Sequence, residues 1–180
     1  MARLPKPRRE DLPGGADKAW ALSANPDGSL RGPHNALIYV PPLSERIAEL
    51  GDHLRNHGAL PGAERELAII ATAREGEARF AFQAHERAGR AAGTRPEAIE
   101  IVRRRGPVEG LTPREQIIVE VVRSLNREHK IPDALFERAL AELGKDLLVE
   151  LVALSGYYGL VGFVLNAFEV DLPADAAPTF

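Results

Sequence analysis

The sequence contains no cysteine among its 180 residues. Disulfide bonds, zinc sites with thiolate ligands and thiol peroxidase chemistry are therefore excluded, because each of them requires a cysteine sulfur. The absence of cysteine is also compatible with a reducing compartment, where disulfides are rare. The charged N-terminal residues 1–11 contain no apolar segment of the kind that directs secretion. We therefore expect a cytoplasmic protein.

Blocks of like charge and long apolar runs are absent as well. The 23 basic and 26 acidic residues are intermixed and give a net charge of −3, so the chain lacks the basic stripe that nucleic-acid binding requires. In the most apolar stretch only 15 uncharged residues separate Glu150 from Asn166, whereas a membrane span needs about 20 strongly apolar residues. We therefore predict a central helix here, with neither a membrane nor a nucleic acid as partner.

Helical periodicity recurs along the chain, whereas a strand-like pattern occurs only at residues 37–40. We interpret this segment as a short buried helix, because a single strand would have no partner. The other predicted helices cover residues 16–23, 42–57, 64–74, 77–92, 94–104, 112–128, 132–143 and 146–170. The predicted fold class is therefore all-α, with about eight or nine helices.

The domain organisation follows from the same pattern. Residues 1–14 are rich in proline and charged residues, which predicts an N-terminal arm that is extended or partly disordered. Residues 15–172 are predicted to form a single helical domain, and residues 173–180 a C-terminal tail.

Two local patterns refine the predicted helices. The first is an apolar stripe on helix 42–57, formed by Leu43, Ile47, Leu50 and Leu54. The second is the sequence Thr-x-x-Glu, which occurs at Thr94 and again at Thr112. Because this pattern is typical of a capping box, we predict that a helix starts at each of the two threonines.

Helix 77–92 carries the leading candidate for a functional residue. Its predicted face consists of Ala78, Ala81, His85, Ala88 and Ala92, because residues three and four apart lie on one side of a helix. The histidine is the one polar residue of this face, and it points where a side-chain-sized space can exist. Its unperturbed pKa of about 6.5 suits proton transfer near neutral pH.

Glu66, His85 and the spacing between them resemble the carboxymuconolactone decarboxylase and alkylhydroperoxidase D-like superfamily. In its peroxidase branch a glutamate is followed after twelve residues by Cys-x-x-Cys-x-x-x-His, which places the two cysteines at Ala78 and Ala81 of this chain. The flanking segments RELAII and HERAGRAAGTRPEAIEIV agree with this correspondence. The resemblance implies an alkylhydroperoxidase D-like helical bundle that associates with copies of itself, as a dimer, trimer or hexamer.

The resemblance also implies a function. Members of the decarboxylase group remove carbon dioxide from a lactone without a metal or an organic cofactor, so the expected partner is a small cyclic acid or lactone. In this lyase reaction His85 would be the acid–base group, and Glu66 would fix its tautomer and support the protonated ring. Thiol peroxidase activity is not supported by the residues, because Ala78 and Ala81 provide no nucleophile.

A non-catalytic interpretation stays open. Glu66 and His85 can form a buried structural pair that holds two helices together. The protein would then be a cysteine-less descendant of the alkylhydroperoxidase lineage that serves as a binding or assembly module. An open cavity beside His85 would favour the enzyme, and a filled one would favour the module.

Four further residues are candidates for substrate binding. Phe82 can fill the gap above His85 that the neighbouring alanines leave. Tyr157 or Tyr158 can face the core and orient a substrate, although a buried tyrosine more often finds a backbone acceptor. His34, which follows a Gly-Pro pair, can close the pocket from the N-terminal side.

Overall fold

The structure, a computed structural model, describes residues 2–172 and residue 180. These residues are 69% helical and form eight α-helices and no strand, which confirms the predicted all-α class. The helices are α1 (Ala16–Ser23), α2 (His34–Leu37), α3 (Pro41–Asp52), α4 (Gly62–Glu75), α5 (Arg79–Ala92), α6 (Pro96–Arg103), α7 (Pro113–Glu128) and α8 (Asp133–Ala167). A 3₁₀-helix, η1 (Arg9–Asp11), precedes α1, and a π-helical turn, η2 (His53–His57), continues α3.

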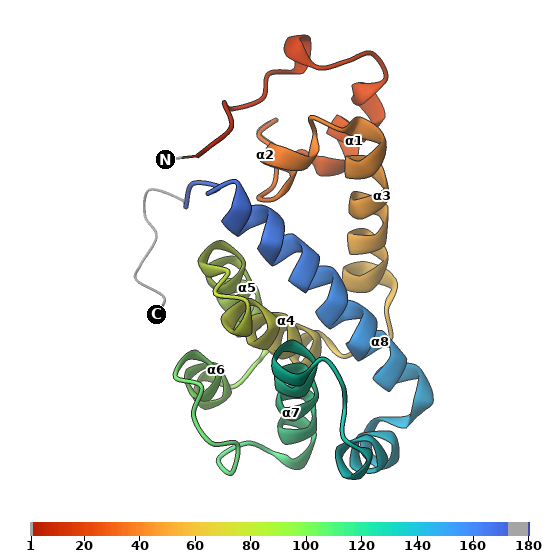
Figure 1. The fold of residues 1–180 in the computed structure, drawn as a ribbon, viewed down its shortest axis with the longest axis vertical. Coiled ribbons are helices and arrows are strands. Elements are labelled where there is room, and N and C mark those ends of the chain that lie inside the picture. Colours follow the sequence, from red (N-terminus) through yellow and green to blue (C-terminus); the bar gives the residue numbers. More distant parts are fainter. Residues whose placement is uncertain (1, 173–179) are drawn as a thin grey trace.

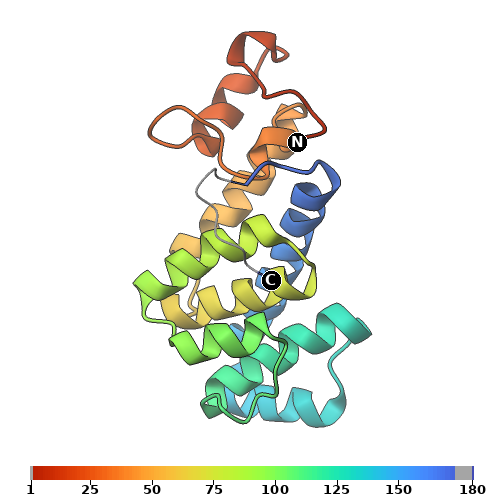
Figure 2. The same cartoon turned by 90° about the vertical axis from the view of Figure 1, so that its left-hand side faces the viewer.

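Helix α4 lies at the centre of the bundle, where it packs against α5, α6, α7 and α8 (Figure 1). Every residue from Glu66 to Ala73 is buried. A helix enclosed in this way is apolar around its circumference rather than along one stripe, which explains the sequence LAIIATA. Helices α1 and α2 lie with the N-terminal arm at one end of the molecule, as Figure 2 shows from the side.

The predicted apolar stripe of helix 42–57 is wrong in part. Ile47 and Leu54 are buried, but Leu43 and Leu50 are 47% and 49% exposed. The buried face instead combines Ile47 with three small residues, Ser44, Ala48 and Gly51. Small side chains let the neighbouring helices approach α3 closely, so hydrophobicity alone does not identify its buried face.

One of the two predicted capping boxes is confirmed. Thr112 Oγ1 accepts a hydrogen bond from the Glu115 amide at 3.3 Å, and the Glu115 carboxylate accepts one from the Thr112 amide at 2.8 Å. The box at Thr94 is wrong, because its hydroxyl donates to the Ala63 carbonyl at 2.9 Å and α6 begins only at Pro96. Proline has no amide hydrogen and a fixed φ, which suits the first position of a helix.

Helix α8 includes both of the last predicted helices. The backbone leaves the helical conformation at Gly144, where φ is 76°, so the predicted interruption is present as a kink. By length and composition alone α8 could cross a membrane. Its residues Leu151, Leu154 and Val161 are buried, however, and the helix packs against α4, α5 and α7. This packing is that of a core helix and favours a soluble protein.

The N-terminal arm crosses the end of α8. The Arg3 amide donates to the Phe168 carbonyl at 3.0 Å, and the Arg3 guanidinium pairs with Glu169 at 2.6 Å. Apart from η1, the described residues of the arm form no regular structure before α1. Residues 173–179 of the predicted tail lie outside the described part of the chain.

Candidate functional site

Glu66 of α4 and His85 of α5 form a direct polar pair. His85 Nδ1 lies 2.7 Å from Glu66 Oε2, and the glutamate is only 4% exposed. Gly89, one turn after the histidine, lets the two helices approach, because a Cβ there would lie 3.3 Å from Glu66 Cβ and 3.1 Å from Ile70 Cδ1. A contact this short is typical of a charge-assisted hydrogen bond, which favours the tautomer with a proton on Nδ1.

The other ring nitrogen of His85 is free. Among the residues that the structure describes, Nε2 has no hydrogen-bond partner, and the one buried side-chain nitrogen or oxygen without a partner is Arg123 Nη2. His85 Nε2 is therefore not sealed from solvent, and the whole side chain is 18% exposed. An imidazole held at Nδ1 and open at Nε2 can accept a proton from a ligand or donate one to it.

Tyr158 and Tyr157 of α8 are both buried, but they face different neighbours. The Tyr158 ring meets the His85 ring edge to face, with centroids 4.8 Å apart and an interplanar angle of 83°. Tyr157 packs against Tyr158 at 5.1 Å, and its hydroxyl donates to the Ile47 carbonyl at 3.1 Å. The structure thus places Tyr158 beside the Glu66–His85 pair and gives Tyr157 a backbone acceptor.

Arg55 is a member of this constellation that the sequence did not indicate. It lies in the π-turn η2, and its Nη1 donates a long hydrogen bond of 3.5 Å to the Tyr158 hydroxyl. Burial raises the pKa of Tyr158 to about 12, although Arg55 opposes this rise. The phenol therefore stays protonated at neutral pH and can donate a hydrogen bond.

The other two candidate substrate contacts have different neighbours. Phe82 is fully buried, where its ring packs against Phe180 at 5.1 Å with the Arg103 guanidinium 4.9 Å away. His34 Nδ1 lies 2.8 Å from Ser44 Oγ, and burial lowers the pKa of His34 to about 4. These rings interact with groups other than His85, and their roles as substrate contacts stay predictions.

The positions that carry cysteine in the peroxidase branch are packed. Ala78 and Ala81 are 0% and 3% exposed, and Gly162 of α8 lies so close that a Cβ there would be 3.2 Å from Ala78 Cβ. Ala78 also precedes α5 instead of lying within it. Any ligand must therefore reach His85 from its solvent-accessible edge rather than through this side of α5.

Two cavities of the described chain lie elsewhere. One, of about 760 Å³, is formed by the N-terminal arm, the segment between α1 and α3, Phe80 and residues 168–172. The other, of about 250 Å³, is an apolar groove around Phe136, Leu148 and Val152. His85 lines neither of them, and no group of three or more His, Asp or Glu side chains able to hold a metal occurs among the described residues.

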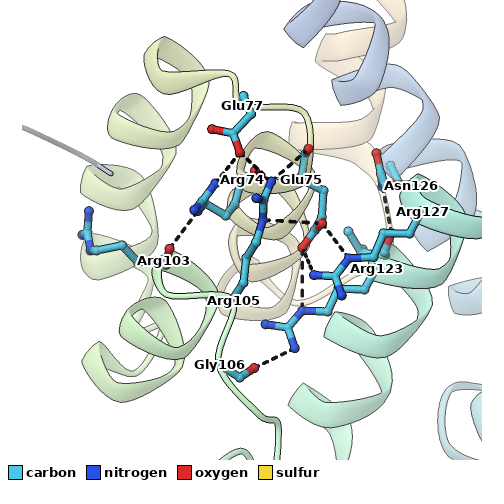
Figure 3. Close-up of polar contacts among 11 residues, drawn as sticks. Arg74, Glu75, Glu77, Arg103, Arg105, Gly106, Arg123, Asn126 and Arg127 are labelled. Atoms are coloured by element: carbon cyan, nitrogen blue, oxygen red, sulfur yellow. Dashed lines mark hydrogen bonds and ion pairs between the residues drawn. The ribbon is translucent and has the colours of Figure 1, made fainter.

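A second cluster of charged residues is paired internally, with Arg123 Nη2 as the one buried nitrogen or oxygen of its described side chains without a hydrogen bond (Figure 3). The Glu75 side chain is 6% exposed and accepts hydrogen bonds from Arg127 at 2.6 and 2.8 Å, with Arg105 and Arg123 at 3.7 and 3.8 Å. Glu77 pairs with Arg105 at 2.6 Å. The cluster links α4, the segment after α6, and α7. Its arginines Arg105, Arg123 and Arg127 each have a carboxylate partner.

The arrangement of helices places the chain in a known structural class. It superposes on an uncharacterized peroxidase-related protein with an alkylhydroperoxidase AhpD core from Ralstonia eutropha JMP134, with a TM-score of 0.77 and 19% identity over 97% of this chain and 93% of that one. An uncharacterized peroxidase-related protein from Silicibacter sp. TM1040 matches over the same shares, with a TM-score of 0.77 and 16% identity. A protein of unknown function from Agrobacterium tumefaciens matches over 81% of this chain and 100% of its own, with a TM-score of 0.68 and 17% identity. At these identities the likeness defines an AhpD-like helical fold.

Part of the sequence also matches a known family. Residues 41–124 match the model of the Carboxymuconolactone decarboxylase family, and this segment contains both Glu66 and His85. No curated protein matches the chain. The family match confirms the resemblance to the carboxymuconolactone decarboxylase and alkylhydroperoxidase D-like superfamily that was predicted from the sequence.

Proposed function

We propose that the protein is an acid–base catalyst of the carboxymuconolactone decarboxylase type that acts on a small cyclic acid or lactone. The observation that carries this proposal is the asymmetry of His85, whose Nδ1 is bound by a buried carboxylate while Nε2 has no partner in the described chain. A purely structural histidine would be expected to use both nitrogens within the fold. We place the protein, as expected from its sequence, in the cytoplasm.

The pair can perform a decarboxylation without a metal. The bond between the ring carbon and the departing carboxylate breaks, carbon dioxide leaves, and the electron pair is delocalised into the lactone carbonyl. The Nε2–H of protonated His85 then donates its proton to the substrate carbon, and solvent reprotonates the ring. Glu66 stabilises the imidazolium through Nδ1 throughout this cycle.

The experiment that tests the proposal is a screen of small lactone carboxylic acids for carbon dioxide release. We expect the wild type to turn over at least one of them, and His85→Gln to lower kcat by about 10²- to 10⁴-fold, the usual contribution of a general acid or base. His129→Asn is a matched control, because His129 is exposed and its φ of 61° suits asparagine. Equal turnover by His85→Gln and the wild type, or no turnover by either, would contradict the proposal.

The alternative is a non-catalytic assembly module, and two observations favour it. The first is that His85 lines neither of the two cavities described above; the second concerns the surface of α8. Several large apolar side chains of α8 are exposed, including Val149 at 69%, Leu160 at 41% and Phe163 at 74%. Such a surface suits contact with another copy of the chain, in the predicted dimer, trimer or hexamer. Analytical ultracentrifugation of Phe163→Lys against the wild type tests this. A lower mass for the variant supports association through α8, whereas an unchanged mass argues against it.

A further inference from the structure

Arg55 differs from the other partly buried arginines because it has no carboxylate partner. A carboxylate oxygen lies within 4.0 Å of each of the others, which are Arg65, Arg74, Arg95, Arg103, Arg114 and Arg123. Among the residues that the structure describes, Arg55 has no such neighbour, and its polar partners are the hydroxyls of Tyr157 and Tyr158. Figure 3 shows two of these pairs, Arg74 with Glu77 and Arg123 with Glu75.

The nearest acid in the sequence, Asp52, attracts Arg55 only from beyond ion-pair distance. Asp52 accepts a hydrogen bond from Asn56 at 2.7 Å and lies 3.3 Å from His57 Nε2. Its carboxylate is therefore engaged on the exposed side of the π-turn. The partners of Arg55 are neutral hydroxyls, whereas a buried charge is best compensated by an opposite charge. An anionic ligand would supply the missing charge.

The position of Arg55 points this charge toward the candidate reaction centre. Its Nη1 lies 3.5 Å from the Tyr158 hydroxyl, and the Tyr158 ring packs against His85. The Tyr158 hydroxyl donates to no acceptor in the described chain, so its hydrogen is available. One guanidinium and one neutral phenol therefore offer adjacent donors, the arrangement that recognises a carboxylate.

The local backbone holds this arrangement in place. Arg55 lies in a π-helical turn, a conformation that is rare and frequently found at functional sites. Gly51, one turn earlier, leaves the necessary room, because a Cβ there would lie 2.1 Å from Tyr157 Oη and 2.8 Å from Arg55 Nη1. A residue without a side chain, Gly51, therefore occupies the position on α3 where Arg55 and Tyr157 meet.

We propose that Arg55 and Tyr158 form a carboxylate-binding subsite beside His85, which anchors an acidic ligand through charge-assisted hydrogen bonds. The inference rests on the proposed function, because it takes His85 as the reaction centre. The carboxylate that leaves as carbon dioxide loses its negative charge in the transition state of decarboxylation. A cation beside that carboxylate would stabilise the charge and so slow the reaction. The carboxylate that Arg55 holds is therefore one that the reaction leaves on the product.

The subsite can be tested by binding alone. Benzoate is the probe, and benzamide is its uncharged counterpart of the same size; their dissociation constants are measured by following protein NMR signals. We expect Arg55→Gln to weaken benzoate binding about 10- to 100-fold, as for other hydrogen bonds to a charged group, and to leave benzamide binding within about 2-fold. Arg55→Lys should be intermediate, because it keeps the charge and loses the fork geometry.

Two controls separate this inference from the proposed function. Arg46→Gln removes an exposed arginine of α3 that already pairs with Glu49, and it should leave benzoate binding unchanged. His85→Gln should also keep benzoate binding within about 3-fold while it removes turnover. If His85→Gln keeps turnover but Arg55→Gln loses benzoate, the proposed function fails and the subsite stands. Wild-type affinity for benzoate in Arg55→Gln, or no benzoate binding to the wild type, would overturn the subsite.

Discussion

Acidification is expected to destabilise the fold through the buried histidine of α2. His34 is 5% exposed, and its pKa is lowered to about 4, mainly by burial and further by the charges of Arg31 and Arg55. In the unfolded chain the same ring has its ordinary pKa of about 6.5. Between these two values the unfolded state binds the proton and the folded state does not. Stability therefore falls as the pH drops from about 6.5 toward 4, and it is restored above 6.5.

The size of the effect follows from the two pKa values. At pH 4.5 the linkage relation gives a loss of about 2 to 3 kcal/mol relative to pH 7.5 from this one group. The assay is urea unfolding followed by circular dichroism at both pH values, on the wild type and on His34→Gln. Glutamine keeps a hydrogen-bonding group near Ser23 and Ser44 but does not titrate in this range. We expect the wild type to lose about 2 to 3 kcal/mol more than the variant on acidification.

The loss of stability on acidification is compared between the wild type and His34→Gln, which removes the contribution of the other groups that titrate. Carboxylates lose their charge over the same range in both proteins, so only the excess loss in the wild type reports on His34. His129→Asn should behave like the wild type, because His129 is exposed. Equal losses in the wild type and His34→Gln would refute the reasoning, since they would mean that His34 binds protons equally in the folded and unfolded states.

Two further predictions concern packing. Glu75→Gln should cost about 3 kcal/mol in urea unfolding, because it leaves the largely buried Arg123 without its carboxylate partner, whereas Glu77→Gln, at a side chain 54% exposed, should cost less than about 1 kcal/mol; equal costs would contradict the buried network. Gly51→Ala should destabilise by about 1 to 3 kcal/mol, since its Cβ would meet Tyr157 Oη. Gly156→Ala, where nothing lies within 4 Å, should be neutral or stabilise by up to about 1 kcal/mol, and the reverse order of the two variants would argue against the packing of α3 on α8.

The helices and the Glu66–His85 pair could be predicted from the sequence, because they depend on residues close together in the chain or at a fixed spacing. Helix α7 begins at a capping box and ends at Glu128 as predicted, since threonine, proline and glutamate at its start act on the nearest turn. The pairing of Glu66 with His85 followed from a resemblance that fixed their spacing, and the structure brings the two side chains into contact.

Features that depend on tertiary packing were not predictable from the sequence. The π-turn at His53–His57 gives no signal in a helical periodicity, so the position of Arg55 next to Tyr158 could not be inferred. The buried face of α3 depends on small residues whose neighbours lie on other helices, because Ser44 meets Ser23 of α1 and Gly51 meets Tyr157 of α8. Thr94 uses its hydroxyl on Ala63 of α4 instead of capping its own helix. In each case the partner lies far away in the sequence.

The central claim is that Glu66 fixes His85 with a proton on Nδ1 and leaves Nε2 free to transfer one. Nitrogen-15 NMR of the His85 imidazole tests this directly, at a pH where the ring is neutral, in the wild type and in Glu66→Gln. We predict that the wild type holds the Nδ1–H tautomer and that this preference weakens or reverses in the variant, since the carboxylate that accepts the proton is gone. A wild-type ring protonated on Nε2, or identical tautomers in both proteins, would contradict the account.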